Sequence, residues 1–288
     1  MPNGEPMKHS LLSSAIIAST LVGCGSDSDT ATFSLNLTDA PLAEIAALNL
    51  HVNSIELKKN SDTFTFEVNE TINLLELQGS TSLNLIDQAE LPAGQYQYIR
   101  VDVDTEQSEL LVGDASFTLD IPSAAQSGLK LVSPFTLSAN GNANFTLDFD
   151  VAKSLSLSAQ GYKLRPTIRI VDNSEIGHIS GTVAAELSNC ESTLSVYAFE
   201  GIEAVFEEQS ETGGPVTSAL VSYNTETQTN EFELGFLEAG DYRLDLVCGD
   251  DDPLSIDELA SIQNVTVNVE ASTTSDAVFE VSIVEVEL

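Results

Sequence analysis

The chain has 288 residues, of which 45 are acidic and 10 are basic, and its formal charge is −35. Hydrophobic residues make up 42% of it, which is enough for the packed cores of two ordinary domains. A chain this acidic repels nucleic acid and anionic membrane surfaces, so the nucleic-acid-binding classes are excluded. We interpret the charge as favouring solubility and salt tolerance, since salt screens self-repulsion beyond roughly 8–10 Å, with binding of cations or of a basic partner as the less favoured alternative.

The N-terminal segment has the pattern of a signal peptide, which fits a start at Met7 better than one at Met1. Its apolar run, Leu11 to Val22, is too short to span a bilayer of ~30 Å as a helix. The run ends in Leu21-Val22-Gly23-Cys24, which resembles the lipobox of bacterial lipoproteins. The resemblance implies removal of residues 1–23 and acylation of Cys24, which would anchor the protein in a membrane. Gly25, and not an aspartate, directly follows the cysteine, which implies the outer membrane of a Gram-negative cell; a plain secretory signal is the alternative.

The negative charge is unevenly distributed along the chain. Residues 177–288 contain 23 acidic residues and one basic residue, Arg243, giving −22, whereas the remainder carries −13. This shift predicts a boundary near residues 172–175. We therefore expect a linker over 24–31, a first domain over 32–173 and a second domain over 177–288.

Short runs of alternating apolar residues dominate the first domain and predict antiparallel strands in a sandwich or small barrel. The alternation beginning at Leu48 shifts phase between Val52 and Ile55, which predicts a β-bulge. We expect short helical turns at Pro41–Ala47 and Leu83–Ala89. The alternating apolar positions are Phe33, Leu35, Leu37; Leu48, Leu50, Val52; Ile55, Leu57; Phe64, Phe66, Val68; Phe145, Leu147, Phe149; and Leu164, Ile168, Ile170.

Five sequence motifs stand out along this domain. They are Phe33–Pro41; Leu91–Tyr96 leading into Ile99–Asp102; Leu129–Val132; Phe145–Asp150 with Lys153-Ser154; and Tyr162–Pro166. In this order they resemble the bacterial domain-of-unknown-function family 4382. The resemblance covers about 140 residues and implies a β-rich fold located just after a lipobox; it implies no chemistry.

The residues of these motifs also have a structural interpretation. Asp39 can start a turn by bonding a downstream amide, and Gly94 permits the turn before the strand that begins at Gln95. Four aspartates alternate with apolar residues, so we expect them on the solvent face of their strands, with a cation site between them as the less favoured alternative. These are Asp102, Asp104, Asp148 and Asp150, and their candidate cross-strand partners are Lys163, Arg165 and Arg169.

Seven strand-like runs in about 110 residues predict an immunoglobulin-like sandwich for the second domain. The pattern Phe232 to Leu246, with Ala239-Gly240-x-Tyr242 at its centre, resembles the transthyretin-like, carboxypeptidase-regulatory-like modules, as does His178–Val183. The runs are Ile179–Leu187, Thr193–Phe199, Val216–Tyr223, Glu231–Phe236, Asp241–Cys248, Val265–Val269 and Ala277–Val284.

One spacing occurs in both domains: Leu91-x-Ala93-Gly94-x-Tyr96 and Leu237-x-Ala239-Gly240-x-Tyr242. We favour convergence over duplication, because any tight turn into a core strand requires a glycine and a half-buried aromatic residue.

Cys190 and Cys248 lie in a chain expected outside the cytoplasm, so they are predicted to form a disulfide. Beyond Cys248, clustered carboxylates on a loop offer oxygen ligands for calcium, but their spacing does not match an EF-hand, so a solvated loop is the favoured alternative. The calcium candidates are Asp250, Asp251, Asp252, Asp257 and Glu258.

No catalytic motif is present: the sequence has no Gly-x-Ser-x-Gly, no phosphate loop and no His-Glu-x-x-His. We therefore predict no enzyme and no cofactor, with calcium as the exception above. The expected function is that of a cell-envelope lipoprotein, a binding or adhesion module with an unidentified protein partner. The alternatives are a carbohydrate-binding module, which the absence of Trp disfavours, and a calcium-dependent binding protein.

Overall fold

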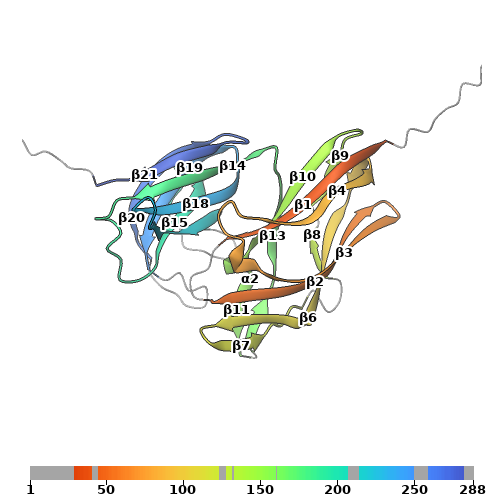
Figure 1. Cartoon of the computed structure of the whole chain (residues 1–288), viewed down its shortest axis with the longest axis horizontal. Coiled ribbons are helices and arrows are strands. Elements are labelled where there is room, and N and C mark those ends of the chain that lie inside the picture. Colours follow the sequence, from red (N-terminus) through yellow and green to blue (C-terminus); the bar gives the residue numbers. More distant parts are fainter. Residues whose placement is uncertain are drawn as a thin grey trace, which may run out of the picture.

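The computed structural model describes residues 29–40, 45–122, 128–131, 133–159, 161–206, 214–249 and 259–281. The regular secondary structure of the described chain is almost entirely β-strand, which confirms the predicted all-β fold (Figure 1). We call strands β1–β13 the first half and strands β14–β21 the second half. No sheet of the described residues contains strands from both halves. Among these residues, no helix has the length and apolar character needed to cross a bilayer.

The first half is built from two large sheets and two small ones. The first large sheet has the order β13 (Thr167–Asp172), β10 (Asn142–Asp150), β1 (Thr30–Ala40), β4 (Leu83–Pro92), with β1 and β10 parallel. The second has the order β3 (Asp62–Asn73), β2 (Ala47–Lys59), β6 (Tyr98–Val112), β7 (Ala115–Thr118), with β8 (Leu129–Leu131) also on β6. The smaller pairs are β5 (Gly94–Tyr96) with β9 (Phe135–Leu137) and β11 (Leu155–Ser158) with β12 (Gly161–Leu164).

The inward-facing apolar residues of these sheets form one core. Within it the Phe135 ring stacks on Phe33, with centroids 5.7 Å apart, and on Tyr96, with centroids 5.1 Å apart. The predicted bulge is confirmed, because the register of β2 shifts between Val52 and Ser54 against both of its neighbours.

The second half forms two sheets of four strands that enclose a separate core. One has the order β17 (Ser222–Asn224), β18 (Thr229–Glu238), β14 (Ile176–Val183), β21 (Thr274–Phe279). The other has the order β16 (Thr217–Leu220), β15 (Leu194–Glu200), β19 (Gly240–Cys248), β20 (Ser261–Val269). The predicted run Val216–Tyr223 is two strands rather than one, because the chain passes from one sheet to the other at Val221.

The two halves share one pattern of strand pairing. In each half the first strand (β1 or β14) pairs in parallel with a late strand (β10 or β21) and antiparallel with the strand before the Ala-Gly corner (β4 or β18). In each half the corner tyrosine donates its hydroxyl to the carbonyl oxygen four residues upstream, at 3.0 Å for Tyr96 and 2.9 Å for Tyr242. This shared pairing is an argument for duplication, whereas the sequence requirements of a tight turn favour convergence.

Two sequence predictions are wrong in this region. Leu83–Ala89, expected to form a helical turn, lies within strand β4; the described helices are η1 (Leu74–Glu76) and α2 (Val151–Ser154). The solvent-face prediction fails at Asp148, which is 7% exposed, because all residues from Phe145 to Phe149 are buried. Strand β10 is flanked on both sides by other strands, and the second half covers its outer face near Asp148.

Candidate functional site

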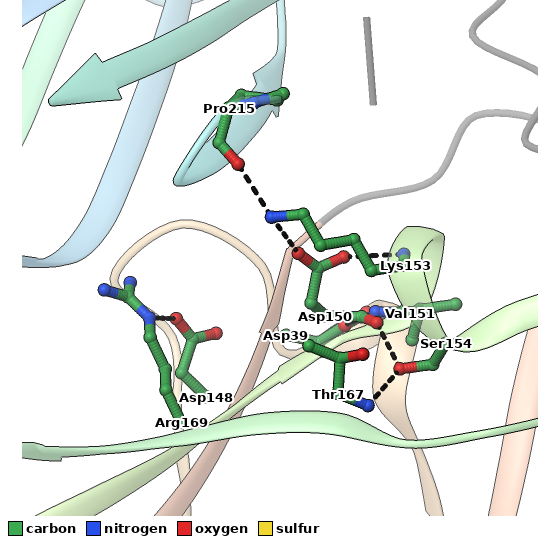
Figure 2. A network of polar contacts seen from close by, with 9 residues as sticks. All are labelled: Asp39, Asp148, Asp150, Val151, Lys153, Ser154, Thr167, Arg169 and Pro215. Carbon is green, nitrogen blue, oxygen red and sulfur yellow. Dashed lines mark hydrogen bonds and ion pairs between the residues drawn. The ribbon is translucent and has the colours of Figure 1, made fainter. Parts of the chain in front are cut away.

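A cluster of polar side chains lies where β10 ends, and two of its cations contact the second half (Figure 2). Its members come from three segments far apart in the sequence: Asp39 at the end of β1, Asp148–Ser154 across the β10–α2 junction, and Thr167–Arg169 on β13. Two of these segments belong to motifs that carry the family resemblance. We call this cluster the polar joint.

Asp150 organises the first part of the polar joint. It is the N-cap of α2, where its Oδ1 accepts from the Lys153 amide at 2.9 Å, satisfying an amide that the helix leaves unpaired. Its Oδ2 lies 3.0 Å from the Lys153 ammonium. The Ser154 hydroxyl donates to the Asp150 carbonyl and accepts from the Thr167 amide, which ties β13 to the helical turn.

Asp39 reaches the same turn from the neighbouring strand. Its Oδ1 accepts a hydrogen bond from the Val151 amide at 3.2 Å, although 112 positions separate the two residues. Just before it, the hydroxyl of Thr38 lies 2.9 Å from the Leu77 carbonyl and 2.8 Å from the Thr81 carbonyl. The end of β1 is therefore fixed to α2 on one side and to the chain after η1 on the other.

The second ion pair of the polar joint is Arg169 with Asp148. These two residues are directly opposite in the β10–β13 register, and Arg169 Nε lies 2.6 Å from Asp148 Oδ2. Burial raises the pKa of the Asp148 carboxyl, while the adjacent Arg169 guanidinium acts in the opposite direction. The cross-strand pairing of Arg169 with an aspartate is as the sequence predicts.

Both cations of the polar joint also bond to the second half. Lys153 donates from its ammonium to the Pro215 carbonyl at 2.8 Å, and Arg169 donates from Nη2 to the Phe236 carbonyl at 3.0 Å. Such charge-assisted hydrogen bonds are stronger than neutral ones. The two halves are therefore linked by two cations whose charge is already balanced by aspartates of their own half.

Close backbone packing lies beside the Arg169 contact. A Cβ added to Gly235 would lie 2.0 Å from the carbonyl oxygen of Gly79, so only glycine fits there. The next residue, Phe236, has φ +54°, a left-handed conformation that is costly for a bulky side chain. Phe236 packs with Val171 and Ile176, so the strained residue contributes apolar contacts between the halves.

His178 supports this strained residue from within the second half. Its ring lies edge-to-face against Phe236 with centroids 5.3 Å apart, and its Nδ1 accepts from the Phe236 amide at 3.4 Å. Burial lowers the pKa of His178, while the charge of Glu233 opposes that effect. A neutral imidazole can accept the amide hydrogen bond, and a protonated one cannot.

The space inside the polar joint is small. A cavity of about 110 Å³ is lined by Asp148, Asp150, Lys153, Thr167, Ile168, Arg169 and Val216. Within the described ranges, no three His, Cys, Asp or Glu side chains come together in a way that would hold a metal ion. The described cluster contains no cysteine or histidine, and its lysine and arginine are each paired with an aspartate. The arrangement is suited to holding two sandwiches together.

The sequence-predicted site residues lie in different places. Asp102 and Asp104 are on β6, in a different sheet from Asp148 and Asp150, so the structure does not bring the four aspartates together. Asp102 accepts from the Asn53 side chain, and Asp104 accepts from Gln107. Lys163 pairs at 3.4 Å with Asp120, and is not one of the partners of those aspartates.

The predicted disulfide between Cys190 and Cys248 is confirmed. Cys24 and the calcium candidates Asp250, Asp251, Asp252, Asp257 and Glu258 all lie outside the described residues.

Sequence reasoning did not identify the contacts that the second half contributes. Pro215 and Phe236 act through backbone carbonyls, which any residue could provide, so no residue type marks them. Gly235 was the available signal, because a glycine within a predicted strand indicates a bulge or a close backbone approach.

Residues 30–166 match the model of a protein family described as Domain of unknown function (DUF4382), which confirms the resemblance of the first half. A comparison with curated proteins found no match to the chain.

Three similar solved structures have identities of 12% or less. The Bacillus anthracis TIE protein is 10% identical with a TM-score of 0.20, covering 86% of this chain, which spans only 33% of that protein. GBS52, the minor pilin of Streptococcus agalactiae, is 12% identical with a TM-score of 0.21, covering 89% of this chain and 99% of the pilin. The family-26 carbohydrate-binding module of Eubacterium rectale Amy13K, solved with maltoheptaose, is 11% identical with a TM-score of 0.21, covering 86% and 91%.

Proposed function

We propose that the protein is a non-catalytic lipoprotein of the cell envelope, acylated at Cys24 and held in the outer membrane. Its two sandwiches act as one binding or adhesion module for another component of the envelope or its surroundings. The lipobox at Leu21–Cys24 supports the location, and the mature chain begins five residues before the first described residue, Asp29.

The proposal that the protein is non-catalytic rests on the contacts that the charged side chains of the polar joint make. Lys153 and Arg169 are each committed to an aspartate of their own half and to a carbonyl of the other half. Charged groups held in this way fix the orientation of two sandwiches and leave no general base beside a nucleophile. A module that must bind a partner while tethered benefits from such a joint, because little orientational freedom remains to be lost on binding.

The location is tested by cell fractionation. We expect Cys24→Ser to move the protein from the membrane fraction to the soluble fraction. The double variant Cys190→Ser with Cys248→Ser is the matched control, since it changes cysteines that the anchor does not need. Retention of Cys24→Ser on membranes washed with high salt would refute the proposal.

A carbohydrate-binding module is a second candidate, favoured by one aromatic pair in which Phe117 is exposed and Tyr162 is partly buried. Phe117 on β7 and Tyr162 on β12 lie edge to face with ring centroids 5.0 Å apart, beside the exposed Leu157 on β11. The interplanar angle of 66° prevents both rings from presenting their faces to one sugar, so this candidate ranks second. A glycan array probed with the wild type and with Phe117→Ala tests it. Binding lost in the variant supports a sugar site, and an array with no signal removes this candidate.

A further inference from the structure

Most of the cations in this acidic protein are neutralised by nearby carboxylates. Nine lysines and arginines lie in the described residues, and five of them form ion pairs: Arg100, Lys153, Lys163, Arg169 and Arg243. Among the described contacts, four form none: Lys58, Lys59, Lys130 and Arg165. Three of these four lysines and arginines lie close together on one sheet of the first half.

The strand register shows how they come together. Lys58 on β2 is opposite Tyr98 on β6, and Lys130 on β8 is opposite Arg100 on β6. The Lys130 ammonium lies 4.0 Å from the centroid of the Tyr98 ring, and the Arg100 guanidinium lies 5.6 Å from it. Lys58, Tyr98, Arg100 and Lys130 share the outer face of the sheet, because Leu57 and Ile99 between them are buried in the core. Lys59, the next residue of β2, projects to the other face, where its ammonium lies 5.8 Å from the centroid of the Tyr96 ring. We call the four outer-face residues, together with Lys59 at their edge, the basic patch.

The basic patch lies where the described chain begins. Asp29 accepts from the Ala93 amide through its carbonyl at 2.7 Å, and Lys59 donates to the carbonyls of Ala93 and Pro92. One residue of the β4–β5 corner, Ala93, therefore contacts both the first described residue and the end of β2. Cys24 precedes Asp29 by five positions, which an extended chain spans in roughly 18 Å at most.

Carboxylates near the basic patch offset part of its charge. Glu56 pairs with Arg100 at 2.8 Å, Asp102 lies two residues beyond Arg100 on the same face of β6, and Asp62 lies opposite Lys59 in the β2–β3 hairpin. Lys58 and Lys130 remain without a carboxylate partner among the described residues, whereas the second half carries −22. In Figure 1, β1 begins and the β2–β3 hairpin ends on the right, while the second half lies on the left.

We propose that the basic patch docks on the anionic phospholipid headgroups of the membrane that holds the anchor, which rests on the proposed acylation of Cys24. Phosphate groups bind lysine and arginine, and a tyrosine ring is suited to the headgroup level, where one side is apolar and the other is wet. The acidic second half then lies away from the membrane. Its charge acts only within a Debye length of about 8–10 Å, so it does not prevent docking of the opposite end.

The size of the effect follows from the two lysines that have no carboxylate partner. A basic residue close to an anionic membrane surface contributes about 1 kcal/mol, which corresponds to roughly a fivefold change in occupancy. Lys58 and Lys130 together should favour the docked orientation by roughly twenty-five-fold on anionic membranes. Raising the salt to about 1 M, where the Debye length is near 3 Å, should abolish that preference.

The confirmed disulfide makes a direct test feasible, because it leaves Cys24 as the only free thiol of residues 24–288. The full mature chain, produced without its signal, is coupled through Cys24 to a maleimide lipid in vesicles. One set of vesicles is phosphatidylcholine alone, and the other also contains phosphatidylglycerol. The acetylation rate of each lysine is then measured by mass spectrometry. This tether replaces native acylation, so failure here is distinguishable from failure of the Cys24→Ser fractionation.

We expect acetylation of Lys58 and Lys130 to slow at least about fivefold on anionic vesicles relative to neutral ones, and to recover in about 1 M salt. Lys163 lies on β12, in a different sheet from the basic patch, so it is the internal control and its acetylation rate should not change. Equal rates on both vesicles would overturn the proposal. So would equal slowing of Lys163, or slowing in concentrated protein without vesicles, which would instead indicate docking on a second copy.

A pair of charge-matched variants gives a second readout, with Lys59 as the reporter amine. Lys58→Glu with Lys130→Glu should remove the protection of Lys59 on anionic vesicles. Lys163→Glu with Arg165→Glu makes the same change in net charge elsewhere and should retain it. Loss of protection in both variants would attribute the effect to net charge alone and would overturn the proposal.

Discussion

Replacing Arg169 by methionine tests the polar joint directly. The change leaves the Asp148 carboxylate without its cation, although that side chain is only 9% exposed, and it removes the bond to the Phe236 carbonyl. Breaking a buried ion pair by removing one partner costs about 3–5 kcal/mol. Because the Arg169 side chain is 31% exposed, we expect the lower end, about 3 kcal/mol of unfolding free energy at neutral pH.

The loss should depend on pH in a defined direction. Burial already raises the pKa of Asp148, and removing the guanidinium removes an influence that lowers it. A carboxyl whose pKa is raised in the folded state binds its proton more readily there than in the unfolded state. The folded state is therefore destabilised as the pH rises through that raised pKa and the carboxyl becomes charged. The destabilisation of Arg169→Met should therefore be largest at neutral pH and shrink as the pH falls. Urea unfolding followed by circular dichroism measures both effects.

Two further variants complete the test. Lys163→Met breaks the 3.4 Å pair with Asp120, whose side chain is 63% exposed, and should cost less than about 1 kcal/mol. Adding Asp148→Asn to Arg169→Met removes the unpaired charge, so the double variant should be more stable than Arg169→Met alone. A loss no larger than that of the Lys163 control, or no recovery in the double variant, would refute the reasoning.

Three further predictions concern the stability of the fold. Replacing both Cys190 and Cys248 by alanine removes a bridge between residues 58 positions apart and should cost about 4 kcal/mol in urea unfolding; an unchanged midpoint would contradict this. Burial lowers the pKa of His178 in the folded protein, so as the pH falls the unfolded state binds this proton first. The free energy of unfolding should therefore decrease as the pH falls below about 6.5, and His178→Gln should flatten that decrease. An unchanged dependence of stability on pH in the variant would contradict this. Tyr96→Phe and Tyr242→Phe each remove the hydrogen bond from the corner tyrosine hydroxyl to a backbone carbonyl, so each should lower the free energy of unfolding by about 1 kcal/mol; an unchanged free energy of unfolding in both variants would contradict this.

Much of the fold could be predicted because strand periodicity is a local property. Alternating apolar residues identify β1, β2, β3 and β10, and the shift of phase after Val52 identifies the bulge in β2. The disulfide was predictable because only two cysteines remained after Cys24 was assigned to the lipobox.

The polar joint could not be predicted from the same patterns. Alternation assigns Asp148 to the outer face of β10, but it cannot show that another part of the chain covers that face. The covering contacts come from the carbonyls of Pro215 and Phe236, and a carbonyl leaves no trace in the residue type. The helical prediction for Leu83–Ala89 failed because its apolar residues fit either period, and pairing with β1 decided the outcome.

The mass of the native N-terminal peptide, measured on protein extracted from membranes, tests the proposed anchoring most directly. The proposed function predicts that the chain begins at Cys24 and that this residue carries acyl chains. A chain that begins elsewhere, or an unmodified Cys24, would contradict the assignment to a lipid-anchored envelope protein.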